Sequence, residues 1–189
     1  MDPKHIYLSR LMDRGRITKA MIFGHHAHES ISQKRKYSGL DYSTHTESVA
    51  DIVAEFRQEE DLIIAALLHD VVEDVPGYTV ARIEDVFGRV AARLVGELTD
   101  VYTHTAFPKL NRATRKTLEN ARLAGISDEG KLIKLADICD NTKDICLHDP
   151  KFARVYCGEM RNLLIHLRPA HYIYGNSELY GRAEMLLSA

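Results

Sequence analysis

Apolar residues recur at intervals of three and four along most of the chain, which is the spacing of one face of an α-helix. Runs of β-branched and aromatic residues between turn signals are absent. The pattern predicts helices at 17–31, 46–57, 59–73, 79–87, 89–100, 110–124, 128–146, 151–167 and 177–187. We therefore expect an all-α fold.

Helix start signals support several of these segments. Thr46 precedes an apolar-periodic stretch, Thr79 follows a Pro-Gly turn, and Ser127 is followed by two acidic residues. Hydroxyl side chains at such positions accept hydrogen bonds from the free N–H groups of the first turn, and acidic residues suit the helix dipole. Pro150 is placed to open the next helix, where its missing N–H costs nothing.

Three segments interrupt the helical pattern and are predicted to be loops: a basic segment at 32–45, and the segments 101–109 and 168–176. We interpret 168–176 as a simple connection rather than a loop that closes over a pocket, because most loops only connect. No linker or repeat divides the chain. The sequence predicts a single domain over 1–189, with a core at about 16–145 and C-terminal helices at 150–189 packing on it.

Composition excludes several classes of protein. The 189 residues are 45% hydrophobic and 28% charged, as in ordinary soluble domains, and the net charge of -2 predicts no nucleic-acid partner. The longest uncharged apolar run, 62–68, is too short to cross a membrane, and no secretory signal is visible. Cys139, Cys146 and Cys157 lack CxxC spacing, which predicts reduced thiols in a cytoplasmic protein. The sequence leaves open whether the chain forms a homo-oligomer.

The segment 61–74 carries the strongest chemical signal. A run of seven apolar residues covers every face of a helix and predicts a buried element. It leads into His69, Asp70, Glu73 and Asp74, which are costly to bury unless they are paired or bound to a cation. Their spacings of one, three and four residues allow all four to converge on one side of the helix terminus.

Two further features could complete a site. Asp137 stands among apolar residues and forms an i, i+4, i+7 stripe with Asn141 and Asp144, although a solvated polar face is an alternative interpretation. His25 and His28 share one helical face, and spacing alone does not choose between them. The basic run 33–37 could bind phosphate through arginine and lysine, or be an exposed loop that binds nothing.

These segments, in this order, resemble the hydrolase domain of RelA/SpoT-type alarmone enzymes, which are HD-domain phosphohydrolases, and most of all the stand-alone small alarmone hydrolases. The matching motifs lie at 23–28, 33–36, 39–45, 65–74, 87–88, 94–95, 99–100, 107–112, 134–137 and Asn141. The resemblance implies an HD-domain helical bundle with one buried metal site. It also implies hydrolysis of the 3′-pyrophosphate of guanosine tetra- or pentaphosphate, with release of pyrophosphate.

The resemblance assigns roles to individual residues. It implies His28, His69, Asp70 and Asp137 as metal ligands, Glu73 and Asp74 as the groups that activate water, and Lys19, Arg35, Lys36 and Asn141 as substrate-binding residues. His45 is expected to organise the loop. The implied cofactor is Mn²⁺, or another divalent cation that suits His and Asp ligands.

The loop that would read the substrate departs from the family pattern. Two extra residues follow His28, and Asp41 and Thr46 stand where the family has proline. The reaction class is therefore better supported than the substrate. Another HD phosphohydrolase activity, on a dNTP, a 5′-nucleotide or NADPH, stays an alternative, as does a non-catalytic nucleotide or metal sensor. The presence of both Glu73 and Asp74 favours an enzyme.

Overall fold

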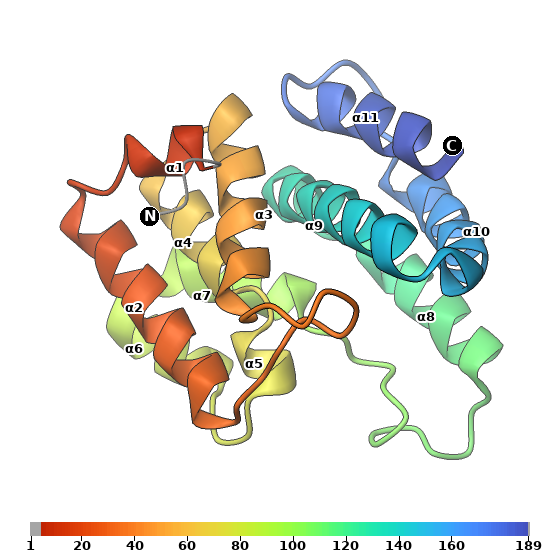
Figure 1. Cartoon of the computed structure of the whole chain (residues 1–189), viewed down its shortest axis with the longest axis horizontal. Helices are drawn as coiled ribbons and strands as arrows, with labels where there is room; N and C mark the ends of the chain where they lie inside the picture. Colours follow the sequence, from red (N-terminus) through yellow and green to blue (C-terminus); the bar gives the residue numbers. More distant parts are fainter. Residues whose placement is uncertain (1–4, 189) are drawn as a thin grey trace.

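The computed structural model describes residues 5–188, which fold as a bundle of helices with one isolated bridge between Lys34 and Asp41. The helices are α1 (Ile6–Ser9), α2 (Gly15–Ser30), α3 (Ser43–Phe56), α4 (Glu60–Leu68), α5 (Val71–Asp74), α6 (Val80–Phe87), α7 (Arg89–Leu98), α8 (Arg112–Ala124), α9 (Asp128–His148), α10 (Pro150–Leu167) and α11 (Asn176–Ser188), as labelled in Figure 1. The all-α prediction is confirmed.

Helix α4 forms the centre of the N-terminal half. Its residues from Leu62 to Leu68 are all buried, and it packs against α2, α3 and α7. A helix that is apolar all round needs neighbours on every side, and these three helices supply them. Gly24 of α2 allows a close approach to α4, because a Cβ there would lie 3.1 Å from the Leu67 carbonyl oxygen.

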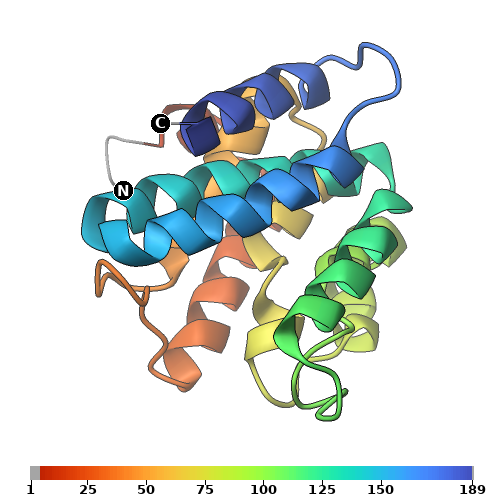
Figure 2. The same cartoon turned by 90° about the vertical axis from the view of Figure 1, so that its right-hand side faces the viewer.

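Helix α9 joins the two halves of the molecule. It packs against α3 and α7 on one side and against α10 and α11 on the other. Figure 2 shows α9 and α10 side by side, with α11 running above them and α8 below their right-hand end. This arrangement brings the middle of α9 next to the junction between α4 and α5.

The predicted helix 59–73 is interrupted in the structure. Helix α4 ends at Leu68 and the short α5 begins at Val71, so His69 and Asp70 lie at the junction. The His69 ring contributes to this break, because its Nδ1 lies 2.8 Å from the Ala66 carbonyl oxygen. That contact takes up a carbonyl that the end of α4 leaves without a helical partner.

The predicted start of α3 is also corrected. The helix begins at Ser43 rather than Thr46, and Thr46 is buried inside it. This earlier start places His45 in the first turn of the helix. The other start signals are confirmed, since Thr79 and Ser127 accept hydrogen bonds from the N–H groups of Arg82 and Gly130 at 3.2 Å and 3.1 Å.

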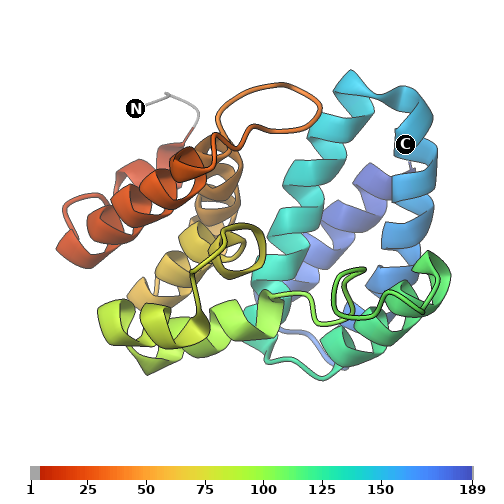
Figure 3. The same cartoon turned by 90° about the horizontal axis from the view of Figure 1, so that it is seen from below.

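The basic segment that follows α2 arches from the end of that helix to the last turns of α9, as Figure 3 shows. Arg35 fastens it there: its side chain is 9% exposed, with Nη2 2.8 Å from Asp140 Oδ2 and Nε 3.2 Å from Asp144 Oδ2. None of the helices within residues 5–188 combines the length and apolar character needed to span a bilayer.

Candidate metal centre

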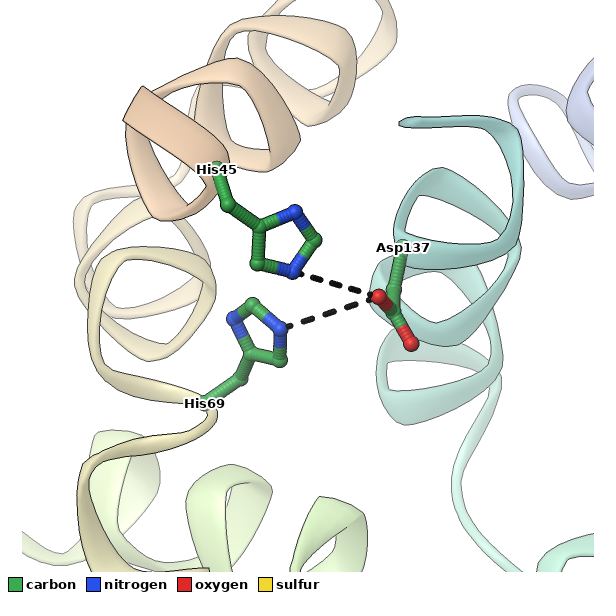
Figure 4. A group of neighbouring side chains, drawn as sticks. All are labelled: His45, His69 and Asp137. Carbon is green, nitrogen blue, oxygen red and sulfur yellow. Dashed lines mark ion pairs between the residues drawn. The ribbon is translucent and has the colours of Figure 1, made fainter. Parts of the chain in front are cut away.

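Three buried side chains from separate helices point toward one another in Figure 4. His45 comes from the first turn of α3, His69 from the junction after α4, and Asp137 from the middle of α9. One ligand atom from each lies within 4.8 Å of the others. The Nε2 atoms of His45 and His69 are 3.3 Å and 3.9 Å from Asp137 Oδ1.

Asp70 closes the fourth side of this group. Its Oδ2 lies 3.1 Å from His69 Nε2 and 3.5 Å from His45 Nε2. The Tyr42 hydroxyl donates a hydrogen bond of 2.6 Å to the same oxygen, which fixes the carboxylate orientation. A polar cluster of two imidazoles and two carboxylates is therefore assembled from three places in the sequence.

The outer nitrogens of both rings are already occupied. His69 Nδ1 lies 2.8 Å from the Ala66 carbonyl oxygen, and His45 Nδ1 lies 2.6 Å from Asp140 Oδ2. Carbonyl and carboxylate oxygens only accept, so each Nδ1 carries the proton when the ring is neutral. Each Nε2 then presents a lone pair to the cluster, and both are buried without a hydrogen-bond partner among the described residues. Metal-binding histidines are commonly held in this way.

The spacing of these atoms fits one cation. Bonds of about 2.1 Å place ligands about 3.0 Å apart at right angles and about 4.2 Å apart when opposite. The separations of 3.1 Å to 3.9 Å fall within that interval. Imidazole and carboxylate ligands suit a divalent ion such as Mn²⁺, Fe²⁺ or Zn²⁺. The site thus has the chemistry of a divalent-metal centre.

The charges in the cluster support each other. Burial alone would raise the pKa of Asp70. The neighbouring His69 and His45 outweigh burial, so the pKa of Asp70 is well below its usual range. Burial likewise raises the pKa of Asp137, and Lys134 together with the histidines outweighs it, so the net shift is downward. The pKa values of His45 and His69 rise, because the carboxylates outweigh the effect of burial. A cation that binds here displaces protons from the rings.

The group of ligand atoms within 4.8 Å does not include His28, although Asp70, Asp74 and His69 lie close enough to the His28 ring to influence its pKa. His28 is buried, its Nδ1 lies 2.7 Å from Gln33 Oε1, and the Gln33 amide donates a 2.8 Å hydrogen bond to Asp74. His45, which we had expected only to organise the loop, takes the place beside His69. His45 stands at the end of the basic segment. Because α3 begins at Ser43 rather than at Thr46, His45 belongs to the first turn of that helix and is buried.

Glu73 and Asp74 extend from α5 beside the cluster. Glu73 is exposed as a residue, yet its carboxyl group lies against protein, with Oε2 accepting a 2.9 Å hydrogen bond from the Asp100 N–H. Desolvation of that carboxyl and the nearby carboxylates of Asp100 and Asp70 raise the pKa of Glu73 to about 7. Burial and Asp70 raise the pKa of Asp74.

The predicted substrate-binding residues are spread more widely. Asn141 lies beside the cluster and donates a 2.6 Å hydrogen bond to Asp137 Oδ1. Arg35 is engaged by carboxylates of α9, and the Lys36 ammonium lies over the Tyr37 ring at 5.3 Å. Lys19 lies over the Phe87 ring at 5.6 Å and about 13 Å from His28 along α2.

Sequence reasoning missed the cationic partner of Asp137. Lys134 Nζ lies 2.9 Å from Asp137 Oδ2, one helical turn away. The i, i+3 spacing was visible in the sequence, but an i, i+3 pair is common on helices and gave no reason to select it.

Two adjoining cavities open beside the cluster. The first, of about 140 Å³, is lined by residues of α8, α9 and α10 that include Lys134, Asp137, Asn141 and Tyr156. The second, of about 250 Å³, is lined by Glu73 and by the cationic side chains Arg112, Arg115 and Lys116. Asp100, Lys116 and Glu119 line both. The cationic side chains Arg112, Arg115 and Lys116 therefore lie on the side of the cluster that faces α8, alongside carboxylates that include Glu73.

The fold and the His-Asp cluster define an HD domain. The HD domain family model matches residues 20–160, so the chain belongs to this family. Within the family it is related to (p)ppGpp hydrolases. It is 33% identical over 170 residues to the bifunctional (p)ppGpp synthase/hydrolase SpoT of Escherichia coli (strain K12), an alignment that covers 88% of this chain and 24% of that protein. The chain thus spans about a quarter of that relative.

Shorter relatives and a solved structure agree. The guanosine-3′,5′-bis(diphosphate) 3′-pyrophosphohydrolase MESH1 of Homo sapiens is 38% identical over 122 residues, which are 63% of this chain and 64% of that protein. A structure described as "A metazoan ortholog of SpoT hydrolyzes ppGpp and plays a role in starvation responses" has a TM-score of 0.77 at 27% identity, covering 92% of this chain and 94% of the other. The resemblance stated from the motifs is confirmed at the level of the family.

Proposed function

We propose that the protein is a divalent-metal-dependent phosphohydrolase that removes the 3′-pyrophosphate of guanosine tetra- or pentaphosphate. The observation that carries the proposal is the convergence of His45 Nε2, His69 Nε2 and Asp137 Oδ1 within 4.8 Å. Both Nε2 atoms are buried and have no hydrogen-bond partner among the described residues. The proposal takes its substrate from the relatives, which include enzymes named as (p)ppGpp hydrolases.

In this proposal His45, His69, Asp70 and Asp137 hold one cation, with Mn²⁺ as the first candidate. His45 replaces His28 in the ligand set expected from the sequence, because its free Nε2 faces Asp70 and Asp137 at 3.5 Å and 3.3 Å. A bound divalent ion lowers the pKa of a coordinated water and neutralises charge on a phosphate oxygen. Asp140 keeps the His45 ring in the orientation that this requires.

Glu73 is our candidate for the group that takes a proton from the attacking water. It borders the cavity that contains Arg112, Arg115 and Lys116, and a carboxyl group with a pKa of about 7 accepts protons near neutral pH. We assign Asp74 a supporting role. The Gln33 amide donates a 2.8 Å hydrogen bond to the Asp74 carboxylate and so fixes its orientation.

We place the substrate in the two cavities beside the cluster. Phosphate groups would meet the three cations contributed by α8, since guanidinium and ammonium groups match phosphate oxygens. The nucleoside would lie near Asn141 and Tyr156, in the cavity between α9 and α10. The expected contributions of Arg35, Lys36 and Lys19 to substrate binding stay predictions.

A hydrolysis assay tests this proposal. The protein is stripped of metal, reloaded with Mn²⁺ and offered ppGpp, pppGpp, NADPH, 5′-nucleotides and dNTPs, with Asp137→Asn as a control for the cluster. Release of pyrophosphate from ppGpp that is abolished by chelator and by the substitution is the expected result. Activity confined to another nucleotide would replace the substrate and keep the metal chemistry. Metal binding without any turnover would indicate a sensor.

A further inference from the structure

A groove between α9, α10 and the end of α11 lies away from the metal centre. A cavity of about 610 Å³ lies there, and Cys146 and Cys157 both line it. Cys146 belongs to the last turn of α9 and Cys157 to the facing part of α10. None of the residues that line this groove lines the two cavities beside Asp137.

The two thiols differ in access but line the same groove. Cys146 is exposed, whereas Cys157 is buried and lies within hydrogen-bonding reach of the Cys146 thiol. Burial and the proximity of Cys146 raise the pKa of Cys157. An incoming reagent therefore meets Cys146 first, with a second thiol lining the same groove. The remaining cysteine, Cys139, is buried elsewhere on α9.

The groove is positively charged. Lys143, Arg154 and Arg161 line it together with the two thiols, and no acidic side chain is among its described lining residues. All three cations are exposed. Such a groove attracts anionic reagents and stabilises the thiolate that leaves during exchange.

We propose that Cys146 and Cys157 are a redox-active thiol pair that forms a reversible intrachain disulfide with an anionic disulfide of low molecular weight. The Cys146 thiolate attacks one sulfur of the reagent, forming a mixed disulfide and releasing one thiolate. Cys157 then gives up its proton and attacks the Cys146 sulfur, which releases the second thiolate. The two protein thiols are oxidised by two electrons, and the reagent is reduced to two thiols that take up the two protons.

The bond would tie together two walls of the proposed substrate cavity. Helix α9 carries Asp137 and Asn141, and α10 carries Tyr156 immediately before Cys157. A disulfide at the last turn of α9 fixes that helix to α10. The proposal itself concerns the thiols and does not depend on which substrate the cavity accepts.

The test uses the full chain, fully reduced and freed of reductant, with oxidised glutathione as the probe. After acid quenching, intact mass and alkylation are measured. The wild type should lose the mass of two hydrogen atoms and leave only Cys139 to alkylate, and dithiothreitol should reverse both changes. Cys157→Ser should stop at a glutathione adduct on Cys146. Cys139→Ser, the matched control, should form the disulfide as the wild type does.

Three results would overturn the proposal. A wild type that keeps a stable glutathione adduct would show that Cys157 does not resolve it. A disulfide-linked dimer would show that Cys146 reacts between molecules. An intrachain disulfide that involves Cys139 would show that Cys146 and Cys157 are not the reactive pair. Far-UV circular dichroism of each variant establishes that the serine substitutions preserve the fold, and none of these readouts requires enzymatic activity.

Discussion

At the scale of single residues, the contrast between His45 and His28 is the most informative feature of the site. Both are buried histidines with an Nδ1 that is held by an oxygen and an Nε2 without a hydrogen-bond partner. They differ in their contacts: His45 Nε2 lies 3.5 Å and 3.3 Å from carboxylate oxygens of Asp70 and Asp137, whereas His28 Nδ1 begins a chain of hydrogen bonds that leads through Gln33 to Asp74.

We expect His45→Ala to weaken Mn²⁺ binding far more than His28→Ala. Loss of a group that only orients a ligand costs about 10–100-fold in affinity, and loss of the ligand itself should cost more. Isothermal titration of metal-free protein with Mn²⁺ measures both. Equal losses in the two variants, or a larger loss for His28→Ala, would return His28 to the ligand set.

Glu73 predicts a pH dependence. Its carboxyl group must be ionised to accept a proton, and with a pKa of about 7 it is protonated below that pH. Turnover should therefore fall as the pH is lowered through about 7, whereas a glutamate of ordinary pKa would stay ionised to about pH 4.5. The kcat profile of the Mn²⁺-loaded enzyme measures this, and a flat profile from about pH 5 to 8 would contradict it.

The same residue predicts a mutant phenotype. Glu73→Gln keeps the shape of the side chain and removes the base, so metal binding should be retained while kcat falls about 100-fold to 10,000-fold. The titration used for His45 supplies the control for metal content. A variant that keeps the wild-type kcat would remove Glu73 from the proposed mechanism.

At the scale of elements, the site depends on how three helices and one loop are joined. His69 lies where α4 gives way to α5, and its ring contacts the Ala66 carbonyl oxygen in the last turn of α4. The basic loop after α2 is fixed to α9 by Arg35 through Asp140 and Asp144, and Asp140 also holds His45. Arg35, which the family resemblance implied as a substrate-binding residue, thus connects the basic loop to His45 through Asp140.

We expect Arg35→Ala to destabilise the protein by about 3 kcal/mol, because it leaves two partly buried carboxylates without their cation. The exposed neighbour Lys36 is the matched control, and Lys36→Ala should change stability by less than about 0.5 kcal/mol. Urea unfolding measures both. Unchanged stability with a raised KM in Arg35→Ala would support the substrate-binding role predicted from the sequence.

At the scale of the whole molecule, α9 connects the N-terminal helices to α10 and α11, and the metal centre lies across that connection. A cation would therefore link α3 and the α4–α5 junction to α9. A ligand that binds only the folded state stabilises it in proportion to its excess over Kd.

At Mn²⁺ concentrations about 100 times Kd we expect a stabilisation of about 2.7 kcal/mol, equivalent to a rise in Tm of about 5–11 °C for a chain of this size. Differential scanning calorimetry with Mn²⁺ and with chelator measures it. Asp137→Asn should show no such difference. A wild type whose Tm is the same under both conditions would argue against a resident cation.

The sequence by itself determined the helical fold, the burial of α4 and the presence of the His-Asp motif. Each of these follows from local spacing: periodicity defines faces, and an uninterrupted apolar run needs neighbours on all sides. Burial cost singled out His69, Asp70 and Asp137 as residues that need a partner, and the family resemblance implied that they act together.

Only the tertiary structure brings His45 beside His69 and Asp137. His45, His69 and Asp137 are far apart in sequence, and no spacing rule relates them. Their meeting depends on the packing of α3 against both α4 and α9, on the start of α3 at Ser43 and on the break after Leu68. Helical periodicity relates residues on one helix, whereas distances between helices are set by the core packing of the entire chain.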